Sequence, residues 1–231
     1  MKKLVLFDID GTLLWTDGAG RSAIRLALMA ELGTAGPIDD FRFDGKTDPQ
    51  IVRQLMTAAK HPEAESKAHI LRVCERYAEL LAGELTARDR RIRVFDGVFE
   101  LLDVLESRED AVLGLLTGNV ERGAFLKLRA GGIDPHRFRV GAYGSDAEHR
   151  PDLPAIAAQR ALEVIGRVPE GDQVVIVGDT PADVACGRRI GARAIAVATG
   201  SYSVADLDSA GAFATFESFA DPIPVVNAIF A

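Results

Sequence analysis

Short runs of apolar residues recur along the chain, and polar or glycine-rich segments separate them. Apolar runs of about four to eight residues are typical of strands that a parallel sheet buries on both faces. We predict strands at residues 4–7, 111–116, 138–142, 173–177 and 193–197, and a weaker one at 212–216. Helical spacing of apolar residues covers 121–130, 153–165 and 182–190, and a closing helix covers 217–230. This alternation predicts an α/β fold with a doubly wound parallel sheet.

The segment between the first two predicted strands has helical patterns only, at residues 21–32, 49–59 and 63–85. Glycine-containing hinges flank it, at residues 17–20 and 96–97. A helical block inserted after the first strand predicts a small all-helical cap domain over the strand ends. We therefore expect an α/β core domain of residues 1–18 and 95–231 and a helical cap domain of residues 19–94.

Composition and charge exclude some classes of binding partner. The chain of 231 residues carries a formal charge of −7 and has a pI of about 5.2, so it lacks the basic surface of a nucleic-acid-binding protein. Its first apolar run ends at Asp8 and is too short to span a membrane, and no signal-peptide pattern precedes it. Cys74 and Cys186 lie far apart and predict neither a disulfide framework nor a zinc site. We expect a cytoplasmic monomer or dimer without nucleic-acid or membrane partners.

The first candidate site follows the first strand, where residues 4–12 read LVLFDIDGT. Asp8 and Asp10 leave the carboxyl end of a buried strand, which is where open α/β sheets bind ligands. Gly11 permits a close backbone approach to a ligand and Thr12 offers a hydroxyl, so we expect both residues to bind the substrate phosphate. The alternative is an ordinary turn, in which Asp-Gly is common.

The second candidate follows the predicted strand 111–116, where the chain reads Thr117-Gly118-Asn119. A hydroxyl, an amide side chain and exposed backbone N–H groups suit phosphate oxygens. The alternative is a simple N-cap and turn before the next helix.

The third candidate is Gly178-Asp179-Thr180-Pro181, followed by Asp183. A helix start explains Thr180 and Pro181 but leaves Asp179 unexplained. Carboxylates at the ends of neighbouring strands repel unless a hard cation lies between them, and oxygen ligands beside phosphate favour Mg²⁺.

These three motifs, in this order, resemble the haloacid dehalogenase-like superfamily of phosphohydrolases over essentially the whole chain, with the helical block in the place of that family's cap. The resemblance implies that Asp8 is the nucleophile, Asp10 the general acid/base and Thr117 a phosphate ligand. It also implies a Mg²⁺ site formed by Asp8, Asp179 and the backbone carbonyl of Asp10, with Asp183 supporting the metal shell. Family members that cleave carbon–halogen bonds lack an acid at the position of Asp10, so its presence favours phosphoryl transfer.

One element departs from the family pattern. The family usually supplies a lysine, often before a proline, between the second and third motifs, whereas this chain has Arg150 before Pro151. A guanidinium can neutralise the same charge, so we take Arg150 as the catalytic cation. A solvated loop charge is the alternative, and Arg188 or Arg189 could then supply the cation.

The predicted cap contains a loop at residues 43–49, and family caps often dip such a loop into the active site. Lys46 in this loop and Arg21 could meet a second anionic or polyhydroxy group of the substrate, although both could also be solvated charges. The sequence thus predicts a Mg²⁺-dependent phosphatase of a small phosphorylated metabolite, acting through an aspartyl-phosphate. A phosphomutase of the same family acting on a sugar phosphate stays open. A non-enzymatic phospho-acceptor or binding module also stays open, but it would need neither Asp10 nor a helical lid.

Overall fold

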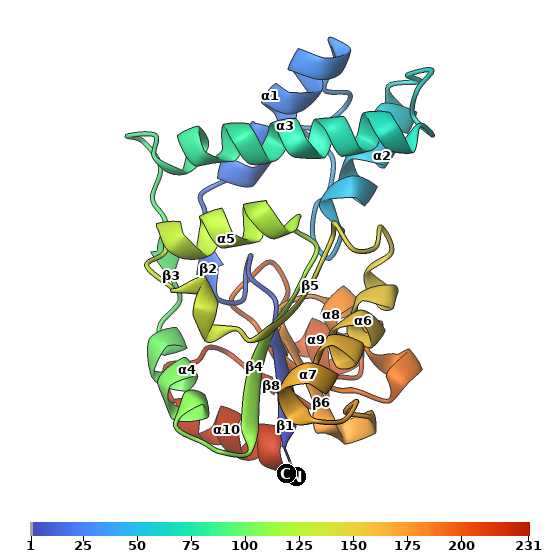
Figure 1. Cartoon of the computed structure of the whole chain (residues 1–231). Helices are drawn as coiled ribbons and strands as arrows, with labels where there is room; N and C mark the ends of the chain where they lie inside the picture. Colours follow the sequence, from blue (N-terminus) through green and yellow to red (C-terminus); the bar gives the residue numbers. More distant parts are fainter. Residues whose placement is uncertain (1) are drawn as a thin grey trace.

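The centre of the molecule is a six-stranded parallel sheet with the order β5-β4-β1-β6-β7-β8 (Figure 1). The structure is a computed structural model that describes residues 2–231. The strands are β1 (Lys3–Phe7), β4 (Ala111–Thr117), β5 (Val140–Tyr143), β6 (Val174–Gly178), β7 (Arg193–Val197) and β8 (Ala214–Phe216). Phe7 at the end of β1 pairs in register with Leu115 of β4 and Val177 of β6. The chain leaves β1 toward β4 and later returns to β6 on its other side, so the predicted doubly wound sheet is confirmed.

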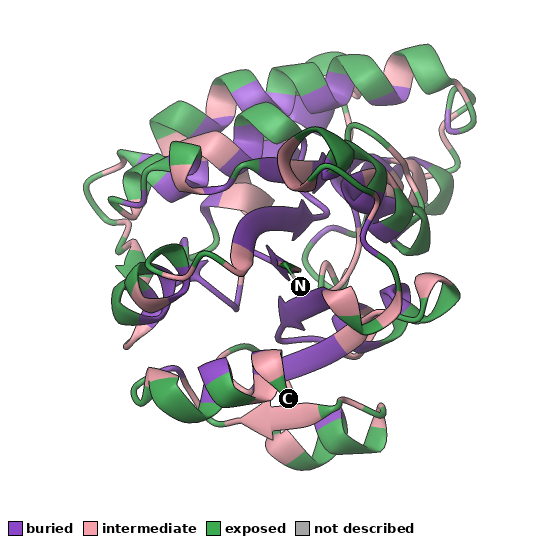
Figure 2. Ribbon diagram, turned by 60° about the horizontal axis from the view of Figure 1, so that its bottom comes forward, coloured by how far each residue is buried: buried purple, intermediate pink, exposed green. Residues whose placement is uncertain are grey.

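Helices cover both faces of the sheet, which explains why successive residues in the middle of its strands are apolar, whichever face they point to. Val5 and Phe7 point into one hydrophobic cluster, with α4 (Val98–Glu106), α5 (Glu121–Ala130) and α10 (Pro222–Phe230). Leu4 and Leu6 point into a second cluster, with α6 (Leu153–Arg160). The helices α7 (Leu162–Ile165), α8 (Pro181–Cys186) and α9 (Val204–Ser209) complete the core. Figure 2 shows the buried strands between helices whose outer sides are exposed.

A second group of helices lies beyond α5, and we call it the helical unit: α1 (Ala19–Leu32), α2 (Asp48–Ala58), α3 (Lys67–Leu85) and the loops between them. These helices share a hydrophobic cluster of their own, and α3 lies along α5 (Figure 1). The short antiparallel strands β2 (Leu14–Trp15) and β3 (Arg93–Val94) pair where the chain enters and leaves the unit. Whether core and helical unit behave as separate domains stays a prediction.

Several predicted boundaries differ from the structure. The helix expected at 153–165 is divided into α6 and α7 at Ala161, and that expected at 182–190 ends at Cys186, before a 3₁₀ turn. The closing helix begins only at Pro222, because the Asp221 side chain accepts from the Ile223 N–H and caps it there. The elements α4, α9, β2 and β3 had no counterpart in the prediction.

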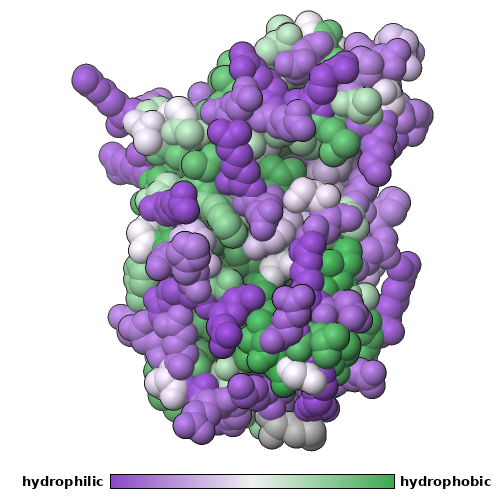
Figure 3. Space-filling view, in the orientation of Figure 1, coloured by the Kyte–Doolittle hydropathy of each residue, from purple (hydrophilic) through white to green (hydrophobic). Residues whose placement is uncertain are grey.

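Hydrophilic side chains cover most of the face seen in Figure 3, and apolar side chains appear there in small groups. Across residues 2–231, no helix combines the length and the apolar character that crossing a membrane requires.

Candidate active site

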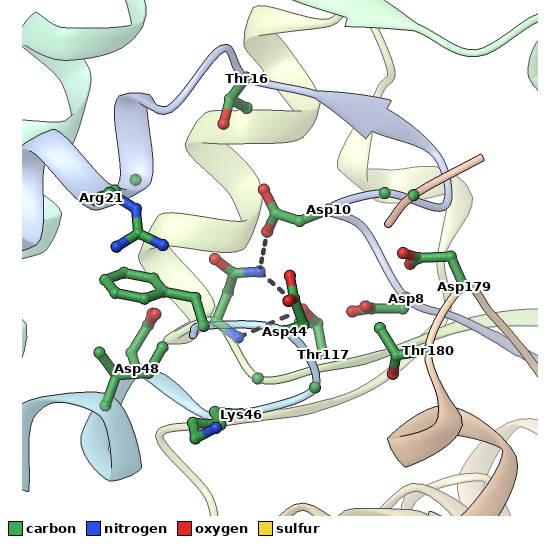
Figure 4. Close-up of a pocket in the computed structure, with 18 of the residues that line it drawn as sticks. Asp8, Asp10, Thr16, Arg21, Asp44, Lys46, Asp48, Thr117, Asp179 and Thr180 are labelled. Carbon is green, nitrogen blue, oxygen red and sulfur yellow. Dashed lines mark hydrogen bonds between the residues drawn. The ribbon is translucent and has the colours of Figure 1, made fainter. Parts of the chain in front are cut away.

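The three sequence motifs meet in one pocket at the carboxyl ends of β1, β4 and β6, and the helical unit closes its other side. Arg21 and Asp48 of the helical unit lie across this pocket from Asp8 and Asp179 (Figure 4). The site therefore draws on both parts of the molecule. The pocket lining includes the predicted residues Asp8, Asp10, Gly11, Lys46, Thr117, Gly118, Asn119, Arg150 and Asp179.

Three buried carboxylates form a cluster at the base of the pocket. Asp8, Asp179 and Asp183 each offer an oxygen within 4.8 Å of the others. Burial raises the pKa of Asp8 to about 6, and the charges of Asp183 and Asp10 add to this while Arg150 opposes it. Burial and the charges of Asp183 and Asp8 raise the pKa of Asp179 well above its ordinary value. Buried, mutually repelling carboxylates are the donor set of a hard divalent cation, so these residues fit Mg²⁺.

The backbone after β1 lies directly against Asp179 of this cluster. Gly11 has a φ of +85°, and a Cβ atom there would lie 2.3 Å from Asp179 Oδ2, so only glycine fits. The Thr12 hydroxyl donates to Asp179 Oδ1 at 2.8 Å and is fully buried. The Thr12 hydroxyl therefore holds the Asp179 carboxylate beneath the pocket, and a contact between Thr12 and phosphate stays a prediction.

Arg150 is the cation at this cluster. Its Nη2 lies 3.3 Å from Asp8 Oδ2 and also donates to Asp183 Oδ1. Burial lowers the pKa of the Arg150 guanidinium, but the charges of Asp183 and Asp8 outweigh this effect. The pKa is therefore raised above its ordinary value. Arg188 donates instead to Ala210 O, and Arg189 pairs with Asp152 at 2.8 Å on the surface. The structure thus brings Arg150, and neither alternative arginine, to Asp8.

The other oxygen of Asp183 explains how the Asp179 loop is fixed. Asp183 Oδ2 accepts from the Thr180 hydroxyl at 2.6 Å and from the Thr180 N–H at 3.0 Å. The reciprocal bond from the Asp183 N–H to Thr180 Oγ1 completes a capping box at the start of α8. The helix start and the acidic cluster share one residue.

The Asp10 carboxylate lies outside the acidic cluster. Its Oδ2 accepts from Asn119 Nδ2 at 2.8 Å and from Lys127 Nζ at 2.6 Å. Asn119 Nδ2 also reaches Thr117 Oγ1 at 2.8 Å, which links the first motif to the second. The predicted metal role of the Asp10 backbone carbonyl stays a prediction. Sequence reasoning missed Lys127, since a single lysine in a helical pattern is typical of a solvated helix face.

The loop before α2 is docked on the second motif. The Asp48 N–H donates to Gly118 O at 2.7 Å, and Asp48 Oδ2 accepts from the Val120 N–H at 2.8 Å. A Cβ atom at Gly118 would lie 2.1 Å from Lys46 O, so this approach requires glycine. Burial raises the pKa of Asp48 to about 7, although Lys127 opposes the shift. The Asp48 side chain was not among the predicted site residues.

The two predicted cap cations both line the pocket. The Arg21 guanidinium lies 4.1 Å from the centre of the Phe43 ring, and its Nη2 donates to Phe41 O at 2.9 Å. Lys46 Nζ lies 5.4 Å from the centre of the Phe41 ring. Arg21 also donates to Ile38 O. Within residues 2–231, neither Arg21 nor Lys46 forms an ion pair with a carboxylate.

The sequence profile of the family described as Haloacid dehalogenase-like hydrolase matches residues 5–197, which include every motif of this pocket. The chain belongs to the haloacid dehalogenase-like hydrolases. A phosphoglycolate phosphatase of Rhodospirillum rubrum is 30% identical over 231 residues, covering 95% of this chain and 89% of that protein. A phosphoglycolate phosphatase of Chromobacterium violaceum is 29% identical over 225 residues, covering 95% and 94%. The predicted superfamily of phosphohydrolases is confirmed.

Solved structures agree on the fold. A hydrolase from Pseudomonas syringae superposes with a TM-score of 0.70 at 23% identity, covering 98% of both chains. This haloacid dehalogenase-like hydrolase thus has the α/β architecture of its superfamily along nearly its whole length. It is an enzyme of the phosphoric monoester hydrolase type.

Proposed function

We propose that this haloacid dehalogenase-like hydrolase is a Mg²⁺-dependent phosphatase that acts on a small phosphorylated metabolite through an aspartyl-phosphate on Asp8. The observation that carries the proposal is the placement of Asp8 between an acidic cluster and Arg150, with Asp10 at the same pocket. In this proposal residues 19–94 are the cap, and the enzyme is a cytoplasmic monomer or dimer without nucleic-acid or membrane partners.

In the first step, an Asp8 carboxylate oxygen attacks phosphorus and forms the new P–O bond. The P–O bond to the substrate breaks as Asp10 gives its proton to the leaving oxygen. Arg150 lies beside Asp8 and neutralises charge on the phosphoryl oxygens. Thr117, Gly118 and Asn119 supply further donors, since positioning and charge stabilisation dominate phosphoryl transfer.

In the second step, Asp10, now a carboxylate, takes a proton from water. The water oxygen bonds to phosphorus, and the P–O bond to Asp8 breaks, which restores the Asp8 carboxylate and releases phosphate. Asp8, Asp179 and the Asp10 carbonyl would hold Mg²⁺, supported by Asp183, and the ion supplies Lewis-acid stabilisation of phosphoryl charge when bound. Thr12 holds Asp179 in place for this purpose.

A phosphorylated carboxylic acid is the substrate class that the pocket supports best. Two relatives across nearly the whole chain are phosphoglycolate phosphatases. In this chain Arg21 and Lys46, which belong to the helical unit, line the pocket and could receive a carboxylate. We therefore propose 2-phosphoglycolate or a similarly small phospho-acid.

The test is release of inorganic phosphate with Mg²⁺ from 2-phosphoglycolate and from 2-hydroxyethyl phosphate, which replaces the carboxylate by an alcohol. We expect repeated turnover of both and a higher kcat/KM for the acid. Incubation with glucose 1-phosphate distinguishes the mutase, which would yield glucose 6-phosphate instead of free phosphate. Absence of repeated turnover on any phosphate ester would contradict the proposal and favour a phospho-acceptor or binding module.

A further inference from the structure

Lys127 is a buried lysine that none of the three motifs contains. It lies on α5 of the core, and its side chain is 6% exposed. Its Nζ donates to Asp10 Oδ2 at 2.6 Å. Burying an ammonium is costly unless a charged partner compensates it, so a lysine buried at this position points to a specific role.

The two donors that hold Asp10 both bind the same oxygen. Asn119 Nδ2 and Lys127 Nζ reach Oδ2, and within residues 2–231 no hydrogen bond is made to Oδ1. The Asp10 side chain is still 35% exposed, on the pocket side. One oxygen is therefore anchored, while the other is left to exchange a proton with a leaving group or a water.

Lys127 also meets the helical unit. A Cβ atom at Gly20, at the start of α1, would lie 3.3 Å from Lys127 Nζ and 3.9 Å from the hydroxyl of Tyr77 on α3. That hydroxyl is buried and has no hydrogen-bond partner among the described residues. The ammonium thus lies between the core and the helical unit, at the edge of the pocket that Lys127 helps to line.

We propose that Lys127 is a positioning residue that anchors Asp10 Oδ2, so that Oδ1 faces the leaving oxygen in the first step and the attacking water in the second. This rests on the proposed function, because it assumes that Asp10 is the acid and base. Lys127 touches neither phosphorus nor the leaving oxygen in this role. Its loss should impair both steps through Asp10.

A different role would give different kinetics. If the Lys127 ammonium instead bound the carboxylate of the substrate, its removal would raise KM for phospho-acids and leave p-nitrophenyl phosphate unaffected. A positioning role predicts little change in KM for phospho-acids and slow turnover of p-nitrophenyl phosphate. p-Nitrophenolate leaves without a proton, so Asp8 is still phosphorylated, but hydrolysis of the aspartyl-phosphate still needs Asp10 as base.

The experiment compares Lys127→Met with Asp10→Asn and with Arg129→Met, which removes an exposed cation from the same helix. For 2-phosphoglycolate or another alkyl phosphate that the wild type turns over, we expect Lys127→Met to lower kcat on the order of 10²-fold with little change in KM. With p-nitrophenyl phosphate we expect a burst of about one nitrophenolate per active site, followed by slow turnover. Asp10→Asn should show the same burst, and Arg129→Met should behave as wild type.

Each result decides the question. Three results for Lys127→Met would overturn the positioning role: no burst, a near-normal kcat, or a loss confined to KM for phospho-acids. The proposed function stands in each case as long as Asp10→Asn remains impaired. Full turnover by Asp10→Asn overturns the proposed function itself, and the inference with it. If Lys127→Met does not fold, as judged by its thermal transition, Lys127→Gln is subjected to the same criteria.

Discussion

Nη2 of Arg150 lies 3.3 Å from Oδ2 of Asp8, and both side chains are buried. The pair joins the end of β1 to the loop before α6, where Pro151 follows the arginine. It places a positive charge beside the oxygen that would attack phosphorus. We therefore predict that Arg150 takes the role of the lysine that the family usually supplies.

Arg150→Ala should therefore lower kcat/KM on the order of 10²–10³-fold, the cost of losing one stabiliser of developing charge. Arg150→Lys should recover part of that loss, because the charge returns without the two-pronged geometry of the guanidinium. Steady-state kinetics on the folded variants checks both expectations. Arg188→Ala and Arg189→Ala serve as surface controls that keep near-normal activity, and an unimpaired Arg150→Ala would assign the charge to another group.

Removal of divalent metal should abolish turnover, because three buried carboxylates within 4.8 Å repel one another without a cation. We expect Mg²⁺ to restore activity after EDTA treatment and to raise the melting temperature, since a ligand that binds the folded state stabilises it. Ca²⁺ should inhibit, as its larger and looser shell can take both oxygens of Asp8. Asp179→Asn should weaken the Mg²⁺-induced rise in melting temperature. Undiminished activity in EDTA would refute the metal assignment.

Because of Asp48, the free energy of unfolding should fall as pH rises. Its folded pKa of about 7 lies above the ordinary value of 3.8, so the folded state holds a proton that the unfolded state has lost between these pH values. The stabilising contribution is complete below pH 3.8 and disappears as pH rises through about 7. Asp48→Asn removes this dependence and keeps a side-chain oxygen for the Val120 N–H. The melting temperature of Asp48→Asn minus that of wild type should increase from pH 5 to pH 8, and a difference independent of pH would contradict this.

Much of the core could be predicted because its signals are local. A buried strand needs an unbroken apolar run, and the carboxylates that end β1 and β6 interrupt such runs at Asp8 and Asp179. Because β1 and β6 are parallel neighbours, Asp8 and Asp179 lie at the same end of the sheet. The α4 helix escaped the prediction although Val98, Leu101, Leu102 and Leu105 have helical spacing and are all buried. The two-residue strands β2 and β3 are too short to carry any periodic signal.

The contacts between core and helical unit could not be predicted, because they depend on how distant segments pack. Nothing near Asp48 in the sequence shows that its carboxylate meets the Val120 N–H. The same holds for Lys127 and Asp10, which lie on different elements and meet only in the folded chain. The local pattern likewise does not show that the Thr12 hydroxyl is buried beneath Asp179.

The proposed mechanism passes through a covalent phosphate on Asp8, which chemical trapping can detect. Asp10→Asn is mixed with p-nitrophenyl phosphate and Mg²⁺, quenched in acid, reduced with borohydride and digested for tandem mass spectrometry. Borohydride reduces an acyl phosphate to an alcohol. An aspartyl-phosphate on Asp8 therefore predicts homoserine in place of Asp8, with aspartate retained at Asp179 and Asp183. Asp8→Asn treated in parallel should show no such product. Nitrophenolate release by Asp10→Asn with an unmodified Asp8 would contradict the account.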